Sequence, residues 1–331
     1  MAPIFIVPET YDQTAFNAAA HHPMQTWEWG EARKETGVEV VRITEQENHI
    51  PINVFQFSLH KIPYTPYKIG YLPRSVIPSK HVLDFLFDYA KKNNIIFLKI
   101  EPYVENDKFQ MTNFKIIKSP HPLFPEWTQM VDLTKTEEEL MKDLKPKTRY
   151  NIRLAQKKGV VVKEISTDEG FAVFSDLYFA TCKRQKYFGH TRKYHEIIWR
   201  NLKNNIPHVL IAYLGDIPLA AYELFYFKDV FYYPYGGTSV LHRNAMGANL
   251  LMWEAILLGK KLGAKKFDMW GSLPPISLGN SSWSGFTRFK EGYGTKYVEF
   301  VGSFDLIVDP VLYAIYNSLH TLRNMYLSLK K

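Results

Sequence analysis

The sequence predicts an α+β protein with mixed sheets, and three observations support this class. Segments with strand and helix patterns follow one another without the strict β-α-β alternation of a doubly wound parallel sheet. Apolar residues make up 46% of the chain and aromatic residues 15%, which is enough for a sizeable core and excludes a disordered chain. The length of 331 residues corresponds to about two domains or one large one.

The N-terminal part of the chain contains both patterns. Helices are expected at residues 12–20, 24–35 and 79–93, and strands at 38–43, 52–60 and 95–100. Pro63 and Pro66 each remove a backbone donor, so residues 61–68 are expected to form a loop. The segment 119–125 is rich in proline and predicts a connection between domains.

A second set of elements follows this connection. Strands are expected at 128–133, 160–165, 208–214, 219–227, 230–235, 266–270 and 297–304, and helices at 146–158, 168–184, 194–204 and 248–262. A further helix is expected to begin at Thr134 or Thr136, where the three glutamates that follow suit the positive end of the helix dipole. Residues 271–285 are predicted to be a loop, and the glycines around 286–294 predict a turn there.

A last helix is expected to begin at Asp309 and Pro310, which suit the N-cap and the first helical position. It carries an apolar stripe at helical spacing, formed by Leu312, Ile315, Tyr316, Leu319, Leu322 and Tyr326. A helix docked on the protein is the favoured interpretation of this stripe, and contact with a membrane surface is the alternative.

Composition and motifs exclude several classes of protein. The single cysteine excludes a disulfide framework, and the histidines show no metal-ligand spacing, so no metal is expected. No apolar stretch reaches the roughly 18 residues of a membrane span, and the N-terminus lacks the signal-peptide pattern. We therefore expect a cytoplasmic protein. The phosphate-loop, dinucleotide-binding, zinc-protease and esterase motifs are absent.

The net charge of +8 suggests an anionic partner, and the basic residues are concentrated in the segment 141–159. Lys145, Lys147 and Arg149 stand at the N-terminal end of a predicted helix, where the dipole disfavours each exposed cation by roughly 0.3–1 kcal/mol. A bound anion would explain this placement. One basic stripe at intervals of four is formed by Lys145, Arg149, Arg153 and Lys157. A merely solvated helix face is the alternative.

Seven short segments, spread over almost the whole chain, form a recognisable series. They are QTxxW at 25–29, LKPKTRYNIRxA at 144–155, YGGxS at 235–239, ANLLxWE at 248–254, FDxWG at 267–271, FKxGxG at 289–294 and FxGxFD at 300–305. In order and spacing, the series resembles the FemABX family of peptidoglycan-bridge aminoacyltransferases.

The resemblance implies two GNAT-like acyltransferase domains in tandem. The first, on the acceptor side, would comprise residues 1–131 with 306–331, and the second, with the basic helix and the catalytic loop, residues 132–305. The interval 193–208 leaves no room for the long helical hairpin of larger members, so the chain looks like the compact, FemX-like form.

The resemblance also implies a reaction and partners. An aminoacyl group would pass from aminoacyl-tRNA to the side-chain amine of a stem peptide, carried on a UDP-linked or lipid-linked muropeptide. An aminoacyl ester is already activated, so no cofactor and no covalent enzyme intermediate are expected. Peripheral contact with the inner face of the cytoplasmic membrane would accompany a lipid-linked acceptor.

The resemblance also implies roles for individual residues, by their positions in the chain. Arg33 and Arg192 match basic residues that bind the acceptor's diphosphate, with Lys34 as the alternative to Arg33. Tyr235 matches a tyrosine that lines the acceptor pocket, and Phe289 one that can stack on the terminal adenine.

The reaction needs a cation near the ester and a group that handles the amine's proton. Lys290 matches a lysine beside the reacting ester and is expected to stabilise the oxyanion or to hold the terminal ribose. Asp268 and Glu101 each end a predicted strand, so either could assist deprotonation or orient the acceptor amine. The basic helix, Lys147 included, is the expected tRNA surface.

Two other functions remain open at this stage. An acyl-CoA-dependent N-acyltransferase has the same fold class, but 242–249 matches the diphosphate-binding turn of such enzymes only poorly. A non-catalytic protein that binds RNA or an anionic membrane would need the basic helix but not the FKxGxG segment.

Overall fold

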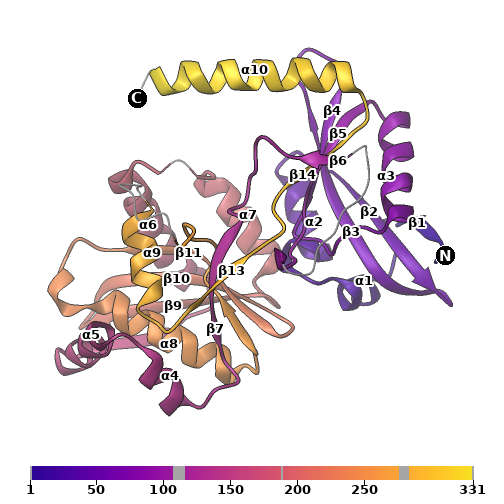
Figure 1. The fold of residues 1–331 in the computed structure, drawn as a ribbon. Helices are drawn as coiled ribbons and strands as arrows, with labels where there is room; N and C mark the ends of the chain where they lie inside the picture. The colour runs from indigo at the N-terminus through magenta and orange to yellow at the C-terminus, as the bar shows by residue number, and fades with distance from the viewer. Residues whose placement is uncertain (1, 107–115, 188, 276–282, 330–331) are drawn as a thin grey trace. The chain divides into compact units, whose positions relative to one another are not determined.

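The computed structural model describes residues 2–106, 116–187, 189–275 and 283–329 (Figure 1). The chain divides into two compact units, and the first of them is discontinuous in sequence. Unit 1 consists of Met1–Phe124 and Phe300–Lys331, and unit 2 of Pro125–Glu299. Each unit is built on a seven-stranded mixed sheet with helices against it, so the predicted α+β class is confirmed.

The sheet of unit 1 has the order β1-β2-β3-β4-β5-β14-β6. Only β4 and β5 pair in parallel among these neighbours, and the other pairs are antiparallel. In this order the strands are β1 (Ile4–Ile6), β2 (Glu39–Glu47), β3 (Ile50–Lys61), β4 (Lys68–Pro73), β5 (Ile95–Glu101), β14 (Phe304–Ile307) and β6 (Ile116–Lys118). The helices are α1 (Gln13–Ala19), α2 (Trp27–Glu35), α3 (Lys80–Lys92) and α10 (Pro310–Leu329).

Local capping explains where the helices of unit 1 begin. The side chains of Asp12, Thr26 and Ser79 accept hydrogen bonds from backbone N–H groups of the first turns of α1, α2 and α3. The apolar face of α3, including Val82 and Leu86, is buried against the sheet.

A buried polar network ties β14 to the rest of unit 1. The Asp305 carboxylate lies 2.9 Å from the Lys99 ammonium of β5, and accepts hydrogen bonds from Ser119 and Tyr313. The Asp305 side chain is 1% exposed and that of Lys99 9%. One carboxylate therefore joins a strand, a loop and the start of α10.

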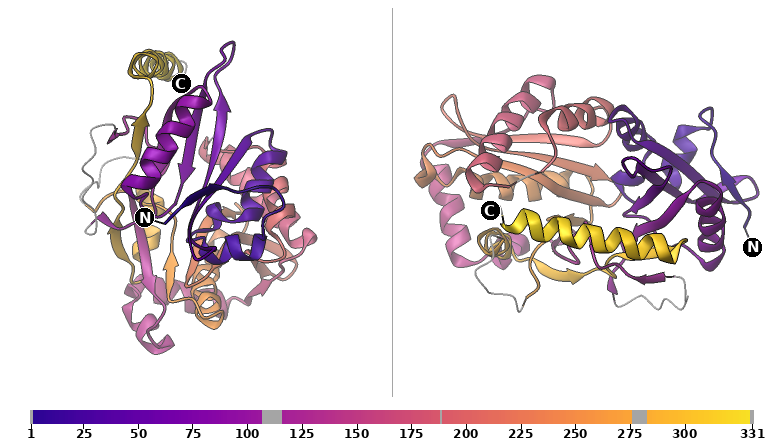
Figure 2. Two further views of the ribbon diagram at one scale, coloured as in Figure 1. Left: turned by 90° about the vertical axis from the view of Figure 1, so that its right-hand side faces the viewer. Right: turned by 90° about the horizontal axis from the view of Figure 1, so that it is seen from above.

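Helix α10 docks along only part of its surface. Tyr313 is buried, and Leu312 and Tyr316 pack with it on Phe97 of β5. On the opposite side of this long helix (yellow in Figure 2), the exposed apolar residues are Val311, Ile315, Leu319, Leu322 and Met325. The docked stripe predicted from sequence is thus wrong for Ile315, Leu319 and Leu322, because only one side of the helix meets the sheet. The Tyr326 side chain lies outside the described part.

The sheet of unit 2 has the order β13-β7-β12-β11-β10-β9-β8, and of these pairs only β11 with β12 is parallel. In this order the strands are β13 (Lys296–Glu299), β7 (Trp127–Asp132), β12 (Lys266–Asp268), β11 (Val230–Thr238), β10 (Ile217–Phe227), β9 (Pro207–Leu214) and β8 (Val160–Glu164). The helices are α4 (Glu137–Asp143), α5 (Pro146–Lys157), α6 (Asp168–Gln185), α7 (Arg192–Leu202), α8 (Gly247–Lys261) and α9 (Ser284–Glu291).

Helices cover both faces of this sheet. One face packs on α5 and α8, which lie side by side (Figure 1), and the other packs on α6 and Trp199 of α7. A Cβ atom on Gly237 of β11 would lie 2.4 Å from the backbone of Leu177 and Tyr178 in α6. Glycine at this position therefore allows α6 to approach β11 closely.

Some predicted elements differ from the structure near glycines and short strands. The predicted turn at 286–294 is wrong, because α9 continues through Glu291 and ends only at Gly292. The predicted strand 297–304 is two strands, since the chain leaves one sheet after Glu299 and joins the other at Phe304. The predicted helix 24–35 begins with a short 3₁₀ turn, Pro23–Gln25, before α2.

Candidate active site

The FKxGxG segment places Lys290 in the interior of unit 2. Lys290 lies in the last turn of α9, is fully buried, and donates hydrogen bonds of 2.5 Å each to the carbonyl oxygens of Met269 and Gly271. The Phe286 ring, one turn earlier, lies 3.6 Å from the ammonium and is 40% exposed. Lys290 therefore fixes the segment that follows β12, with Phe286 against its charged end.

The electrostatics of this position favour an amine that releases its proton easily. Burial lowers the pKa of Lys290 well below its ordinary value, and the nearby Asp268 carboxylate counteracts this only in part. Asp268 is buried and accepts hydrogen bonds from Thr128 and from the backbone N–H of Trp270. The predicted pair Lys290 and Asp268 thus meets around one short segment, residues 268–271.

Phe289, beside Lys290, is half-buried. Its ring packs on Tyr293 at a centroid distance of 5.3 Å and on the core between the sheet and α8. The ring is therefore held on one side by the protein, while α9 directs Lys290 to the segment after β12.

A second group of predicted residues gathers on the α6 and α7 face of the sheet. Tyr235 of β11 is half-buried, and its ring lies 4.7 Å from that of His195 and 5.7 Å from that of Tyr178. Arg192, at the start of α7, donates to the Ser175 hydroxyl at 2.8 Å and pairs with Asp176 at 3.0 Å. The Arg192 side chain is 45% exposed, so part of its guanidinium faces solvent.

Aromatic contacts connect this second group with the segment that binds Lys290. The Phe225 ring lies 6.3 Å from Tyr235 and 6.4 Å from Trp270. Trp270 stands between Met269 and Gly271, the two residues whose carbonyls accept from Lys290. Tyr235, Arg192, Asp268 and Lys290 therefore belong to one continuous region of unit 2.

In unit 1, the structure distinguishes between the two predicted cations of α2. The Lys34 ammonium is held by the carboxylates of Glu9 at 2.6 Å and Glu31 at 3.0 Å. Arg33 is half-buried, and its charge lowers the pKa of His60, although burial is the larger cause of that shift. Two carboxylates already neutralise Lys34, so its ammonium is engaged within the protein.

Glu101, at the end of β5, forms hydrogen bonds that stabilise the fold of unit 1. Its carboxylate accepts from the Tyr71 hydroxyl at 2.7 Å and from the backbone N–H groups of Leu123 and Phe124 at 2.7 and 3.3 Å. This buried carboxylate holds the loop that ends unit 1's first segment. The contacts account for Glu101 without a substrate amine.

The basic helix forms as α5, but its cations do not share one role. Lys145 pairs with Glu291 at 2.8 Å, and the Arg149 guanidinium donates to the carbonyls of Lys142 and Leu144 at the end of α4. These two cations therefore stabilise local structure. The residues Lys147, Tyr150, Arg153 and Lys157, further along the helix, are exposed.

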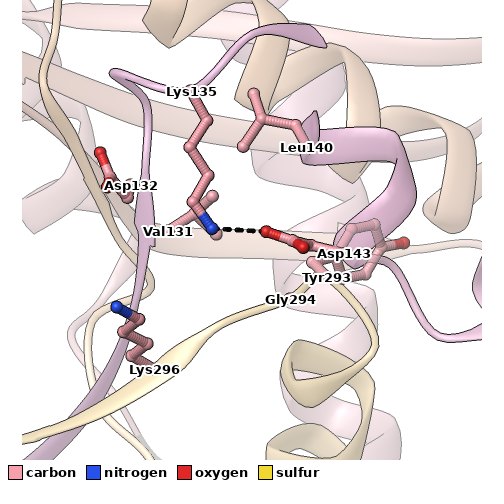
Figure 3. Close-up of a pocket in the computed structure, with 8 residues that line it drawn as sticks. All are labelled: Val131, Asp132, Lys135, Leu140, Asp143, Tyr293, Gly294 and Lys296. Carbon is pink, nitrogen blue, oxygen red and sulfur yellow. Dashed lines mark hydrogen bonds and ion pairs between the residues drawn. The ribbon is translucent and has the colours of Figure 1, made fainter. Parts of the chain in front are cut away.

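Unit 2 also has a small pocket that is lined by other residues (Figure 3). It is lined by Val131, Asp132, Lys135, Leu140, Asp143, Tyr293, Gly294 and Lys296. The Lys135 ammonium pairs with Asp143 at 2.6 Å, so the main charges in it are already matched. The pocket includes none of the residues predicted to act on substrate.

Comparison with known proteins now identifies the family. Residues 117–215 and 212–321 match the FemAB family. The chain belongs to this family. A lipid II:glycine glycyltransferase of Staphylococcus epidermidis is 24% identical, over 88% of this chain and 89% of that protein. A lipid II:glycine glycyltransferase of Staphylococcus aureus is 29% identical over 53% of this chain and 46% of that protein.

Solved structures show how this FemAB chain is folded. The crystal structure of FemX matches with a TM-score of 0.82 at 20% identity, over 95% of this chain and 99% of that one. A tandem GNAT protein of the clavulanic acid pathway matches with a TM-score of 0.51 at 9% identity, over 94% and 99%. These likenesses confirm the tandem GNAT-like, FemX-like fold predicted from sequence.

Sequence reasoning missed one functional candidate of this FemAB chain, Glu223 on β10. Its side chain lies beside Tyr235 in the middle of a buried strand. The only available signal was a single carboxylate within the apolar run 219–227.

Proposed function

We propose that this FemAB protein transfers an aminoacyl group from aminoacyl-tRNA to the stem-peptide amine of a lipid-linked peptidoglycan precursor. The observation that carries the proposal is the similarity over 88% of the chain to a protein named for glycyl transfer to lipid II. The arrangement of Tyr235, Asp268 and Lys290 within one region of unit 2 supports an acyl-transfer site there.

The chemistry requires that a neutral amine attack the ester carbonyl and that the developing oxyanion be stabilised. An ammonium has three N–H donors, and Lys290 spends two on the carbonyls of Met269 and Gly271. We assign the third donor to the oxyanion or to the tRNA's terminal ribose. Asp268 acts through its position beside Lys290, since its charge favours the ammonium form. Phe289 is assigned to the terminal adenine.

Arg192 is assigned to the acceptor's diphosphate, and Arg33 is the candidate of unit 1 for binding a phosphate group. Arginine suits this role because its planar fork binds phosphate oxygens in pairs. Tyr235 lines the acceptor's path. The two compact units are proposed to be the acceptor-side domain and the domain with the catalytic loop.

Charge reversal on α5 tests the donor side. Arg153→Glu with Lys157→Glu removes two exposed cations that have no capping role, unlike Arg149. The slope of log affinity for tRNA against log salt should become shallower by about 0.7–0.9 for each lost phosphate contact. Filter binding of tRNA over a salt series measures it.

The matched control for this test is Lys91→Glu with Lys92→Glu, two exposed lysines in the last turn of α3. The control carries the same change of net charge and should keep the wild-type slope. Equal slopes for the α5 variant and the wild type would place the tRNA elsewhere.

The exposed face of α10 supports contact with the membrane that carries a lipid-linked acceptor. The sequence 310–331 contains no Asp or Glu and ends in two lysines, so an amphipathic helix here suits an anionic lipid surface. None of the described helices is long and apolar enough to cross a bilayer. An amphipathic helix of this kind would lie along the membrane surface.

Vesicle sedimentation measures this contact. Leu319→Glu with Leu322→Glu should lower partitioning onto phosphatidylglycerol vesicles at least tenfold, since each buried leucine contributes roughly 1.5–3 kcal/mol. The control, Ala314→Glu with Thr321→Glu, adds the same charge at exposed positions outside the stripe. If both variants lost partitioning to the same extent, the loss would be due to the change of net charge and not to the exposed apolar residues.

One experiment decides the proposed function as a whole. The pure protein is incubated with a charged tRNA pool or, in a parallel reaction, with acyl-CoA. Each reaction contains either lipid II or the UDP-linked pentapeptide, and the product mass is measured. An added aminoacyl mass on the lipid-linked acceptor supports the proposal. Transfer from acyl-CoA in place of aminoacyl-tRNA would support the alternative on the same fold.

A further inference from the structure

Glu223 is a buried carboxyl group to which the proposed reaction gives no role. Its residue is 1% exposed on β10, and neither carboxyl oxygen has a hydrogen-bond partner within the described ranges. A buried polar group without a partner destabilises a fold. Its presence therefore needs an explanation beyond packing.

The register of the sheet places Glu223 beside the predicted acceptor tyrosine. Glu223 is directly opposite Tyr235 on β11, so the two side chains leave the sheet on the same face, with Cβ atoms about 5 Å apart. The pairing of β10 with β11 is interrupted by a bulge between Glu223 and Phe225. Bulges of this kind are common next to active sites, where they redirect side chains.

Among the described residues, Tyr178 of α6 and Tyr235 of β11 interact with Glu223, and Val209 of β9 lies opposite it on the other side. None of these three carries a positive charge, and His195 of α7 packs against both tyrosine rings. The His195 Nε2 atom has no hydrogen-bond partner among the described residues either. Burial raises the pKa of Glu223 to about 8 and lowers that of His195 to about 4.

This combination suits one class of ligand. A carboxyl group lined by aromatic rings, with no cation of its own, is complementary to an alkyl ammonium group. The half-buried Tyr235 connects the carboxyl with the surface, and Phe225 and Trp270 connect it with the segment that binds Lys290. An amine held here would therefore be near the lysine assigned to the ester.

We propose that Glu223, with the rings of Tyr178 and Tyr235, forms the subsite for the acceptor's side-chain ammonium, and that its carboxylate removes the proton before attack. The inference rests on the proposed function and deepens it, because it names the group that prepares the nucleophile.

The proposed step is balanced without a further reactant. The ammonium gives one proton to the Glu223 carboxylate, and the neutral nitrogen uses its lone pair to form a C–N bond with the ester carbonyl. The ester C–O bond then breaks, and the tRNA's terminal hydroxyl leaves with a proton from the new ammonium centre. The Glu223 carboxyl returns its proton to solvent.

Glu223→Gln tests the proton transfer, because the amide has the same shape and cannot accept a proton. We expect kcat/KM for transfer to fall at least 100-fold at pH 7. In the wild type, kcat/KM should rise with pH as Glu223 loses its proton, and this rise should be missing in the variant. The control is Glu254→Gln on α8, a half-buried carboxyl on the other face of the sheet, which should keep wild-type activity.

Stability provides a readout that a structural role would not reproduce. Between the pH at which an exposed glutamate titrates and about pH 8, the folded chain keeps a proton that the unfolded chain has released, so the wild type loses stability as pH rises. Glu223→Gln should lose none and should show a higher Tm than the wild type at pH 8. A variant that is both less active and less stable at this pH would contradict the proposal.

Binding separates this inference from the proposed function. The probes are a UDP-linked pentapeptide with lysine at its third position and the same molecule with norleucine, which lacks the amine. The wild type should bind the lysine form at least tenfold more tightly, and Glu223→Gln should bind both alike. If the wild type shows this preference but transfers nothing, the subsite stands and the reaction is wrong. If it transfers with Glu223→Gln fully active, or shows no preference, the subsite is wrong.

Discussion

Lys290→Met should lower kcat/KM for aminoacyl transfer by about 10²- to 10³-fold, the loss expected when one preorganised donor to an oxyanion is removed. The variant keeps the length of the side chain in its buried position but cannot donate to Met269, to Gly271 or to a substrate oxygen. Rates of product formation over a series of aminoacyl-tRNA concentrations measure the change.

The same substitution should change the pH dependence in a predictable direction. The pKa of Lys290 is held below that of an ordinary lysine, so its ammonium is lost at a lower pH. Wild-type kcat/KM should therefore fall on the alkaline side, and the fall that belongs to Lys290 should be missing in Lys290→Met. If the residual activity of Lys290→Met still fell at the same pH, the alkaline fall of kcat/KM would be due to another group.

A matched lysine separates this effect from backbone support. Lys260 of α8 also donates to two backbone carbonyls, those of Leu133 and Lys135, at 3.3 and 2.8 Å. Lys260→Met should cost stability of the same order, about 1–3 kcal/mol for each carbonyl left without a donor in the interior, but little activity. If both variants lost activity in proportion to stability, Lys290 would have only a structural role.

The helices of this protein could be predicted from sequence because their signals are local. The expected helices 12–20 and 79–93 begin where Asp12 and Ser79 accept from first-turn N–H groups, and Pro310 begins α10 as expected. Such signals depend only on residues within one or two helical turns, so they can be recognised in a single sequence.

Features that depend on residues far apart in the chain could not be predicted in this way. The glycines of the FKxGxG segment look like turn residues, but Gly292 is the C-cap of α9. A Cβ atom on Gly292 would meet Thr148, and one on Gly294 would meet Asp143. The i, i+4 spacing of α5 predicted one basic stripe, whereas Glu291 and the end of α4 engage Lys145 and Arg149. The single carboxylate of Glu223 in the apolar run 219–227 could not be interpreted from local sequence, because its neighbour Tyr235 lies across the sheet.

Asp305→Ala should destabilise unit 1 by about 3–5 kcal/mol, because it leaves the Lys99 ammonium buried without its counter-ion. The Tyr313 hydroxyl loses its acceptor at the same time, so the docking of α10 should weaken. Urea unfolding followed by circular dichroism measures the first effect, and amide hydrogen exchange in residues 310–320 the second.

The net contribution of the Asp305–Lys99 ion pair to stability differs from the loss caused by removing only one of its partners. Burying two charges is expensive, so replacing both by apolar side chains of similar size should recover most of the loss. Asp305→Leu with Lys99→Met should therefore be more stable than Asp305→Ala alone, while α10, still without an acceptor for Tyr313, should exchange faster than in the wild type. A double variant no more stable than the single one would mean that Ser119 and Tyr313, rather than the charge on Lys99, carry the stabilisation by Asp305.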